Sequence, residues 1–301
     1  MPVMQANGVK LSYHIQGDGE PLLLHMGIAQ QWVLWSPELM DRLEAAGFQV
    51  IAYDYRDTGL SSVMDHLGPP KVFSVLMGAL TGRPVAAPYS LWDLADDAAG
   101  LLDGLGITSA HTMGISMGGM VAQCLTIRHP SRIRSLCSIM STTGSRRYAV
   151  GQPHALRALL RPVPQDEDAA IEHVVQVYQV LGGSHYRQDV DWLRSRFRLS
   201  AQRGYTPHGF LRHFAAILSS GSRRHLLADL ELPAVIMHGA ADPLIPVAAG
   251  RATAKAIPGA RFVELPKMGH VLPPELFDQM VSEIARNAKV SRLTLQQRST
   301  Q

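Results

Sequence analysis

The order of hydrophobic and polar positions along the first 140 residues alternates between short apolar runs and longer segments with helical spacing. The short runs, such as 21–26 and 49–53, are typical of buried strands. The longer segments, such as 36–47 and 90–105, place their apolar residues along one face of a helix. This alternation is typical of a mostly parallel sheet with helices on both faces, so we expect an α/β fold.

Local turn signals and further apolar runs extend this assignment through the first half of the chain. Asn7-Gly8 separates the segments 2–6 and 9–16, and this dipeptide is typical of a hairpin turn. The same reasoning predicts a strand that ends at 111–113, a helix over 117–129 and a strand over 133–140.

The alternation stops between residues 141 and 230, where helical periodicities occur without a convincing buried strand. It then resumes with strands over 234–238 and 261–265 and helices over 247–257 and 274–288. The sequence therefore predicts a helical insertion placed late in an α/β core.

This pattern divides the chain into three parts. We expect residues 1–140 and 231–290 to form the core, and residues 141–230 to form a helical cap, or lid. Residues 291–301 are polar, and we expect them to form a frayed tail.

The bulk composition excludes several classes of protein. The net charge of +3 is too small to indicate a nucleic-acid-binding protein, and no apolar run is long enough to span a bilayer. The first twenty residues lack the hydrophobic core of a signal peptide. Cys124 and Cys137 lie in apolar surroundings without metal-binding spacing, which predicts buried, reduced thiols. We therefore expect a cytoplasmic enzyme.

A glycine-flanked serine is the strongest chemical signal in the sequence. Gly114-Ile-Ser116-Met-Gly118 lies between a predicted strand and a predicted helix, which is the context of a nucleophile elbow. The turn forces Ser116 into a strained backbone conformation, and the two glycines leave room for it. Ser116 is therefore the predicted nucleophile.

A nucleophilic serine needs a base, and the base needs a group that orients it. His270 follows the strand over 261–265, and Asp242 follows the strand over 234–238. The other strand end that could supply the acid is followed by Ser141, Thr142 and Thr143, and it offers no carboxylate. We therefore predict His270 as general base and Asp242 as its orienting acid; His238 is expected to be structural.

Two backbone N–H groups are expected to form the oxyanion hole. The first is that of Met117, the residue after the nucleophile. The second comes from the loop after the strand over 21–26, where Gly27 permits a sharp turn and Ile28 is the predicted donor.

These motifs and their strand contexts resemble the esterase and lipase branch of the α/β-hydrolase superfamily. Within it, the elbow and Asp54-Tyr-Arg-Asp-Thr-Gly-Leu-Ser61 are similar to the aclacinomycin methylesterase type and related carboxylesterases. One departure is that Met26 stands where many relatives carry the histidine of a His-Gly pair, and His25 lies one residue earlier. Relatives that form an alkyl-enzyme ester use an aspartate at the elbow, a role that Ser116 cannot fill.

The predicted cap has an unusual charge distribution, with twelve arginines, no lysine and six carboxylates between residues 146 and 224. These arginines either form a solvated outer face or a basic rim for an anionic substrate such as an acyl-CoA or a phospholipid. Residues 72–88 form a second unusual segment, an apolar helix that either lines an acyl pocket or packs under the cap.

The resulting hypothesis is a serine hydrolase that cleaves esters or thioesters of small or lipid-like molecules through an acyl-enzyme on Ser116, without a metal or other cofactor. The alternatives on the same residues are a cofactor-free perhydrolase or a C–C bond hydrolase. A non-catalytic ligand-binding relative of the fold is the alternative from another class.

Overall fold

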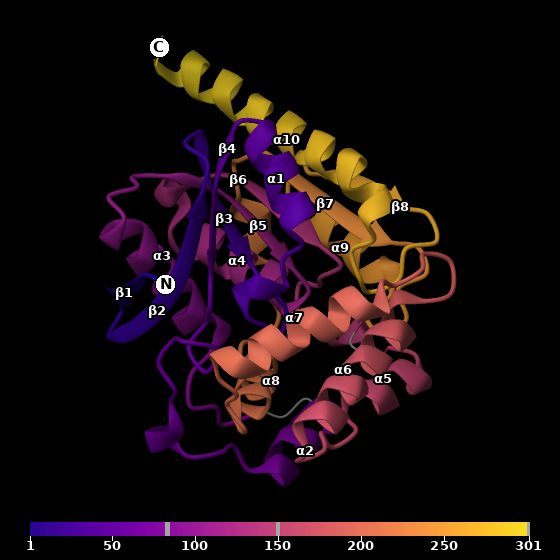
Figure 1. Ribbon diagram of the computed structural model, residues 1–301. Coiled ribbons are helices and arrows are strands. Elements are labelled where there is room, and N and C mark those ends of the chain that lie inside the picture. The colour runs from indigo at the N-terminus through magenta and orange to yellow at the C-terminus, as the bar shows by residue number, and fades with distance from the viewer. Residues whose placement is uncertain (82–84, 149–150, 300–301) are drawn as a thin grey trace.

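The computed structural model describes residues 1–81, 85–148 and 151–299. An eight-stranded sheet runs through the molecule (Figure 1). Its strands are β1 (Val3–Ala6), β2 (Val9–Gln16), β3 (Glu20–His25), β4 (Phe48–Tyr53), β5 (Ala110–Ile115), β6 (Ile133–Ile139), β7 (Ala234–Gly239) and β8 (Arg261–Leu265).

The strand order is β1-β2-β4-β3-β5-β6-β7-β8. The pairs β1–β2 and β2–β4 are antiparallel, and the remaining pairs are parallel. The mostly parallel sheet that the sequence predicts is therefore confirmed. The parallel strands point their carboxyl ends toward one edge of the sheet, where the loops after β3, β5, β7 and β8 meet.

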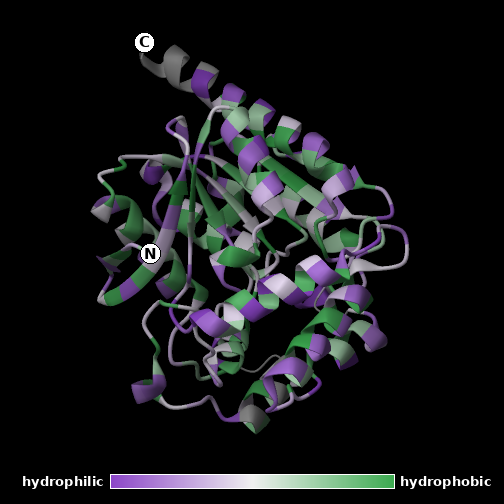
Figure 2. Cartoon of the chain, in the orientation of Figure 1, coloured by the Kyte–Doolittle hydropathy of each residue, from purple (hydrophilic) through white to green (hydrophobic). Residues whose placement is uncertain are grey.

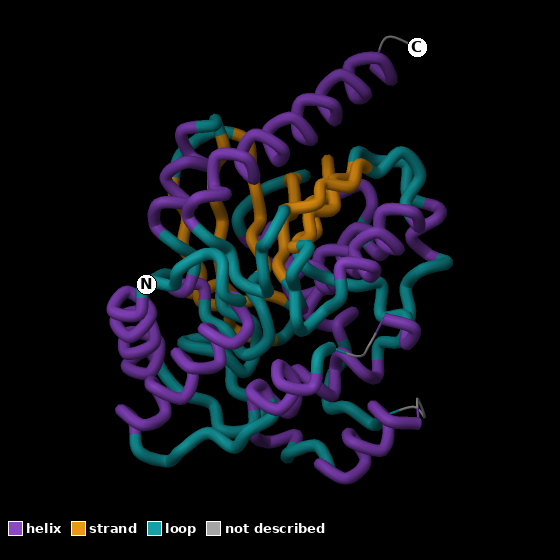
Figure 3. The backbone as a smooth tube through the Cα atoms, turned by 90° about the vertical axis from the view of Figure 1, so that its right-hand side faces the viewer, coloured by secondary structure: helices purple, strands orange, loops and turns teal. Residues whose placement is uncertain are grey.

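Helices cover both faces of the sheet, as the tube view shows (Figure 3). The α-helices are α1 (Pro37–Ala45), α2 (Val72–Thr81), α3 (Leu91–Gly104), α4 (Met117–Arg128), α5 (Pro153–Leu159), α6 (Glu167–Gly182), α7 (Val190–Arg203), α8 (Gly209–Ser219), α9 (Val247–Ala256) and α10 (Phe277–Ser299). Short 3₁₀ turns include η1 (Trp32–Leu34), η4 (Arg146–Tyr148), η5 (Leu226–Asp229) and η6 (Pro274–Leu276).

Local chemistry accounts for several of the element ends. The β1–β2 hairpin turns through Asn7 and Gly8, both with positive φ, as a tight primed turn requires. Helix α3 begins with a capping box, in which Ser90 and the side chain of Asp93 satisfy each other's backbone groups. These elements lie within one or two residues of their predicted positions.

The carboxyl-terminal tail differs from the expectation of a frayed segment, because α10 continues as one helix to Ser299. No glycine or proline follows Pro274, so nothing in the sequence stops the helix. The residues after 288 include Lys, Arg, Leu and Gln, which favour helix formation even when they are exposed.

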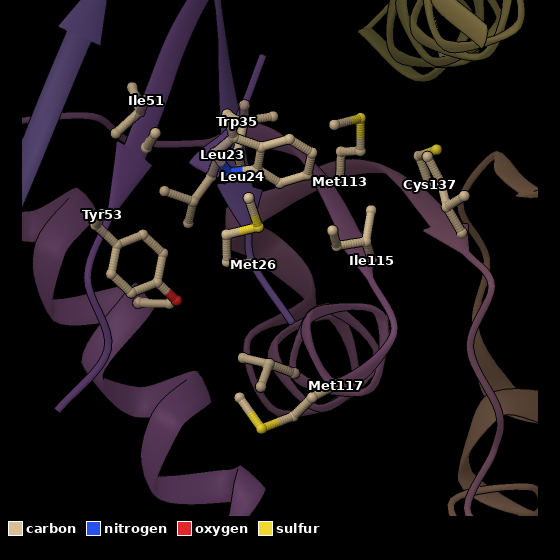
Figure 4. Close-up of a cluster of buried hydrophobic side chains, with 14 of the residues drawn as sticks. Leu23, Leu24, Met26, Trp35, Ile51, Tyr53, Met113, Ile115, Met117 and Cys137 are labelled. Carbon is tan, nitrogen blue, oxygen red and sulfur yellow. The ribbon is translucent and has the colours of Figure 1, made fainter. Parts of the chain in front are cut away.

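The main hydrophobic core lies between the sheet and its helices and reaches the end of the sheet where the elbow lies (Figure 4). There Met113 and Ile115 of β5, Met117 of α4 and Met26 after β3 are all buried. Hydropathy follows the same division, with hydrophobic residues along the central strands and hydrophilic residues on outward helix faces (Figure 2). The loops at this sheet edge therefore rest on a packed apolar base.

Between β6 and β7, the described residues form helices and turns and contain no strand. Helices α5–α8 lie together at the end of the sheet where the parallel strands finish (Figure 1). No helix in the described ranges is long and apolar enough to cross a membrane.

The two thiols should be inert in the folded protein. Cys124 and Cys137 are free and buried, and burial raises the pKa of Cys124 to about 11 and also raises the pKa of Cys137. We expect iodoacetamide at pH 8 to leave both thiols unmodified under native conditions and to modify both in guanidinium chloride, as read by intact mass. Rapid native labelling of either thiol would contradict this burial.

Candidate active site

The predicted nucleophile lies on a strained turn between β5 and α4. Ser116 has φ 53° and ψ −119°, a conformation that residues other than glycine rarely adopt. A Cβ at Gly114 would overlap the backbone of Gly118, and one at Gly118 would overlap the carbonyl of His25. The turn is thus closed so tightly that both positions exclude any side chain, as the sequence predicts for an elbow. The Ser141 hydroxyl also donates to the Ser116 carbonyl at 2.7 Å.

The structure brings the three predicted residues into one chain of hydrogen bonds. The Nε2 atom of His270 lies 3.0 Å from Ser116 Oγ, and its Nδ1 atom lies 2.7 Å from Asp242 Oδ2. Since a carboxylate only accepts, Nδ1 carries the ring hydrogen and Nε2 is free to accept the serine proton. The arrangement can therefore deprotonate Ser116 as it attacks an electrophile.

Asp242 is held as an anion by its surroundings. Its Oδ1 atom accepts the backbone N–H groups of Leu244 and Ile245, each at 2.9 Å. Burial alone would raise the pKa of Asp242, but the charge of His270 and hydrogen bonds from His238 and His270 outweigh it and hold this pKa well below its usual range. The Asp242 carboxylate is therefore ionised in the folded protein near neutral pH.

His238 has a second contact that the sequence reasoning missed. Its buried Nε2 atom lies 2.9 Å from the Ile245 carbonyl and 3.3 Å from Asp242 Oδ2. The signal available in the sequence was its position four residues before Asp242, which places both side chains at the end of β7. His238 thus combines its expected packing role with a contact to the acid.

The two predicted oxyanion donors lie on adjacent segments. The first turn of α4 packs directly against the end of β3. Gly118 lies so close to the carbonyls of His25 and Met26 that a Cβ at this position would overlap them. Within the described part of the chain, the N–H groups of Met117 and Ile28 have no hydrogen-bond acceptor. Both donors are therefore available to an anionic oxygen, and the amino end of α4 adds its dipole.

His25 lies one residue before the usual histidine of this loop, and its side chain bonds to the neighbouring strands of the sheet. Its Nδ1 atom lies 2.8 Å from the Tyr53 hydroxyl, and its Nε2 atom lies 2.8 Å from Thr112 Oγ1. Burial lowers the pKa of His25 to about 3, so the ring is neutral. With both nitrogens occupied, His25 has no free group for chemistry at Ser116.

At least six of the twelve cap arginines are held by contacts within the protein. Three of them, Arg203, Arg212 and Arg223, are buried. On α7, Arg194 pairs with Glu172 and Arg198 pairs with Asp168, both on α6. Arg196, on the opposite face of α7, donates to the Val33 carbonyl. These arginines hold the cap together or fasten it to the core.

The cap contacts two of the four loops that carry predicted catalytic groups. The His270 N–H donates to the Leu181 carbonyl at the end of α6 at 2.7 Å. On the other side, Gln30 in the loop after β3 donates to the Tyr178 hydroxyl at 2.7 Å. The cap is therefore hydrogen-bonded to the site.

The apolar segment over 72–88 packs under the cap in its described part. Val75 of α2 and Val85 are buried in a cluster with Ala215 of α8. Phe73 is 76% exposed, and residues 82–84 lie outside the described residues. The observed packing favours structural support of α8 over an acyl pocket.

A hollow at the amino end of β7 lies away from this site, and no metal cluster is found among the described residues. In the described ranges, no group of three or more His, Cys, Asp or Glu side chains could hold a metal ion. A hollow of about 650 Å³ lies at the amino end of β7, lined by residues 228–233, 258 and 259. None of the predicted catalytic residues lines that hollow.

Comparisons with known proteins agree with this geometry. A family model described as alpha/beta hydrolase fold matches residues 20–275. Rhodomycin D methylesterase DnrP of Streptomyces peucetius is 28% identical over 315 residues, covering 97% of this chain and 99% of the relative. A pimeloyl-acyl-carrier-protein methyl ester esterase of Chromobacterium violaceum is 30% identical over 204 residues, covering 66% of this chain and 77% of the relative.

A similar solved structure is the enol-lactonase from Burkholderia xenovorans LB400. Its TM-score is 0.70 at 23% identity, and the match covers 96% of this chain and 100% of that chain. This likeness supports the fold, which the sheet order already indicates. Because the family model spans well over half of the sequence, the chain belongs to the α/β-hydrolase fold family.

Proposed function

We propose that the protein is a serine hydrolase of carboxylic esters, with Ser116 as nucleophile, His270 as general base and Asp242 as the acid that orients the base. The observation that carries this proposal is the continuous hydrogen-bond chain Ser116–His270–Asp242 at a glycine-flanked elbow. The methylesterase relatives support the same class of reaction.

The geometry implies a two-step acyl transfer to water. His270 Nε2 takes the proton of Ser116 as Oγ attacks the ester carbonyl, and Asp242 stabilises the resulting imidazolium. The N–H groups of Met117 and Ile28 hold the oxyanion. The alkoxide leaves with the proton from His270, and a water activated by the same histidine then releases the acid from Ser116. No step requires a metal or an organic cofactor.

We further propose that the substrate is a methyl ester of a small-molecule or carrier-bound acid. Two relatives are named for methyl ester cleavage, one on rhodomycin D and one on a pimeloyl group attached to a carrier protein. Thioesters, lipid esters, peracid formation and C–C cleavage remain alternatives on the same residues. A cytoplasmic location is part of the proposal, and the two unpaired cysteines support it.

The first test concerns the catalytic residues. Ser116→Ala and His270→Ala should each lower kcat for a methyl ester by about 10⁴-fold to 10⁶-fold, and the double variant should lose little more, because the residues act as a unit. A fluorophosphonate should label the wild type and fail to label Ser116→Ala. The exposed Ser131→Ala variant is a matched control and should behave as the wild type. Hydrolysis by Ser116→Ala at the wild-type rate would refute the assignment, and absence of labelling in the wild type would favour a non-catalytic binder.

A second test separates neutral from anionic substrates. Because several cap arginines are neutralised by carboxylates, we expect the ratio of kcat/KM for an acyl-CoA to that for the matching methyl ester to change little with salt. Raising the ionic strength from about 0.01 M to about 0.15 M shortens the Debye length from about 30 Å to about 8 Å. A steep fall of the ratio that is abolished in Arg194→Gln/Arg198→Gln would instead restore the basic rim and an anionic substrate.

A further inference from the structure

His213 on helix α8 of the cap joins two separate segments of the core. Its side chain is fully buried. The Nδ1 atom accepts the backbone N–H of Ala29 at 3.1 Å, and the Nε2 atom lies 2.9 Å from the Arg56 carbonyl. Ala29 directly follows Ile28, the proposed second oxyanion donor.

The two contacts require one particular form of the ring. A carbonyl oxygen only accepts, so Nε2 must carry the hydrogen, and Nδ1 must be bare to accept the N–H of Ala29. Burial lowers the pKa of His213 to about 4. The Arg56 carbonyl and Asp57 oppose this lowering, whereas the charges of Arg212 and Arg56 add to it. The ring is therefore neutral near pH 7 and can make both bonds.

The loop that His213 contacts is strained where the contact is made. Ala29 has φ 54°, a left-handed conformation that is unfavourable for a residue other than glycine and persists only when the surroundings hold it. The N–H of Ala29 belongs to the peptide plane next to the one that carries the Ile28 N–H. Fixing one plane limits rotation of the other, because only the two dihedrals of Ile28 lie between them.

Few other bonds hold this loop. Over residues 27–30, within the described chain, the backbone makes one hydrogen bond to a distant segment, the bond to His213. The Gln30 N–H reaches only the Gly27 carbonyl, at 3.3 Å. The remaining cap contacts in this region use side chains, such as that of Gln30 with Tyr178. On the other side of the donor, the Tyr55 hydroxyl of the core donates to the Met26 carbonyl at 3.2 Å. His213 is thus the group of the cap that acts directly on the backbone beside the donor.

We propose that His213 is a positioning residue for the oxyanion hole, which fixes the peptide at Ala29 from the cap and thereby aims the Ile28 N–H at the developing oxyanion. This inference rests on the proposed ester hydrolysis. It makes the cap part of the catalytic geometry as well as a cover.

A pair of substitutions separates the two bonds. Asparagine at 213 can place its Oδ1 atom where Nδ1 lies and still accept from Ala29, whereas glutamine can place its Nε2 atom where the ring Nε2 lies and still donate to Arg56. Removal of one oxyanion donor costs about 10²-fold to 10³-fold in kcat, and a misdirected donor costs less. We therefore expect His213→Gln to lower kcat about 10-fold to 100-fold with KM nearly unchanged, and His213→Asn to retain activity within about 3-fold.

The inhibition constant of a transition-state analogue distinguishes a positioning role from a purely structural one, because a purely structural role would leave it unchanged. The adduct of a trifluoromethyl ketone with Ser116 puts an oxyanion in the hole, so its inhibition constant should rise in His213→Gln in parallel with the loss of kcat. Tyr89→Phe is the matched control: the ring of Tyr89 lies 6.1 Å from that of His213, and its hydroxyl donates to Asp57 at 2.6 Å. This variant should lower the melting temperature without changing kcat.

Equal kcat and inhibition constants in His213→Gln, His213→Asn and the wild type would overturn the proposal. So would equal losses in both variants that follow their melting temperatures. If neither variant folds, the ¹⁵N chemical shifts of His213 in the wild type show which ring nitrogen carries the hydrogen. A hydrogen on Nδ1 would exclude the bond from Ala29 and overturn the proposal. Failure of the proposed function would show differently, as hydrolysis that does not depend on Ser116.

Discussion

The close approach of helix α4 to the end of strand β3 is the contact on which the site depends. It exists because Gly118 lacks a side chain and meets the backbone of His25 and Met26 directly, and Gly114 in the same way lets the end of β5 meet the first turn of α4. The same contact fixes three things at once: the strained φ of the serine, the direction of the Met117 N–H and the nearness of the loop that carries Ile28. A methyl group at either glycine would push these segments apart, and the surrounding core is too densely packed to absorb the shift.

Charge burial organises the rest of the site, and each buried charge has partners. Asp242 has two backbone donors and two histidines. Arg203 at the end of α7 pairs with Asp54, and Arg212 of α8 pairs with Asp57, so the segment over 54–61 holds two helices of the cap. Breaking a buried pair by removal of one partner leaves an uncompensated charge and typically costs about 3–5 kcal/mol. This segment therefore attaches the cap to the core, which explains why its charged residues are buried.

Arg223 shows a different solution to the same problem. It is fully buried and donates to the carbonyls of Thr142 and Gly221 and to Gln123, with no carboxylate bonded to it among the described residues. Thr142 and Gly221 lie near the two places where the chain leaves and re-enters the core. The guanidinium therefore links the two connections between the core and the cap. Burial lowers the pKa of Arg223. With the contacts of His213, Tyr178 and Leu181, this makes the cap a fixed part of the site.

The sequence by itself determined the sheet, the elbow and the identity of the three proposed catalytic residues, because these depend on local patterns: period-two and buried apolar runs, glycine spacing, and polar residues directly after strands. It did not determine the direction of the cap arginines or the roles of His213 and His238. The number of arginines in the cap does not show whether their side chains face solvent or a carboxylate within the protein. A histidine at position 213 gains its meaning only when α8 packs against Ala29 and Arg56, residues far from it in sequence, and only tertiary packing decides such contacts.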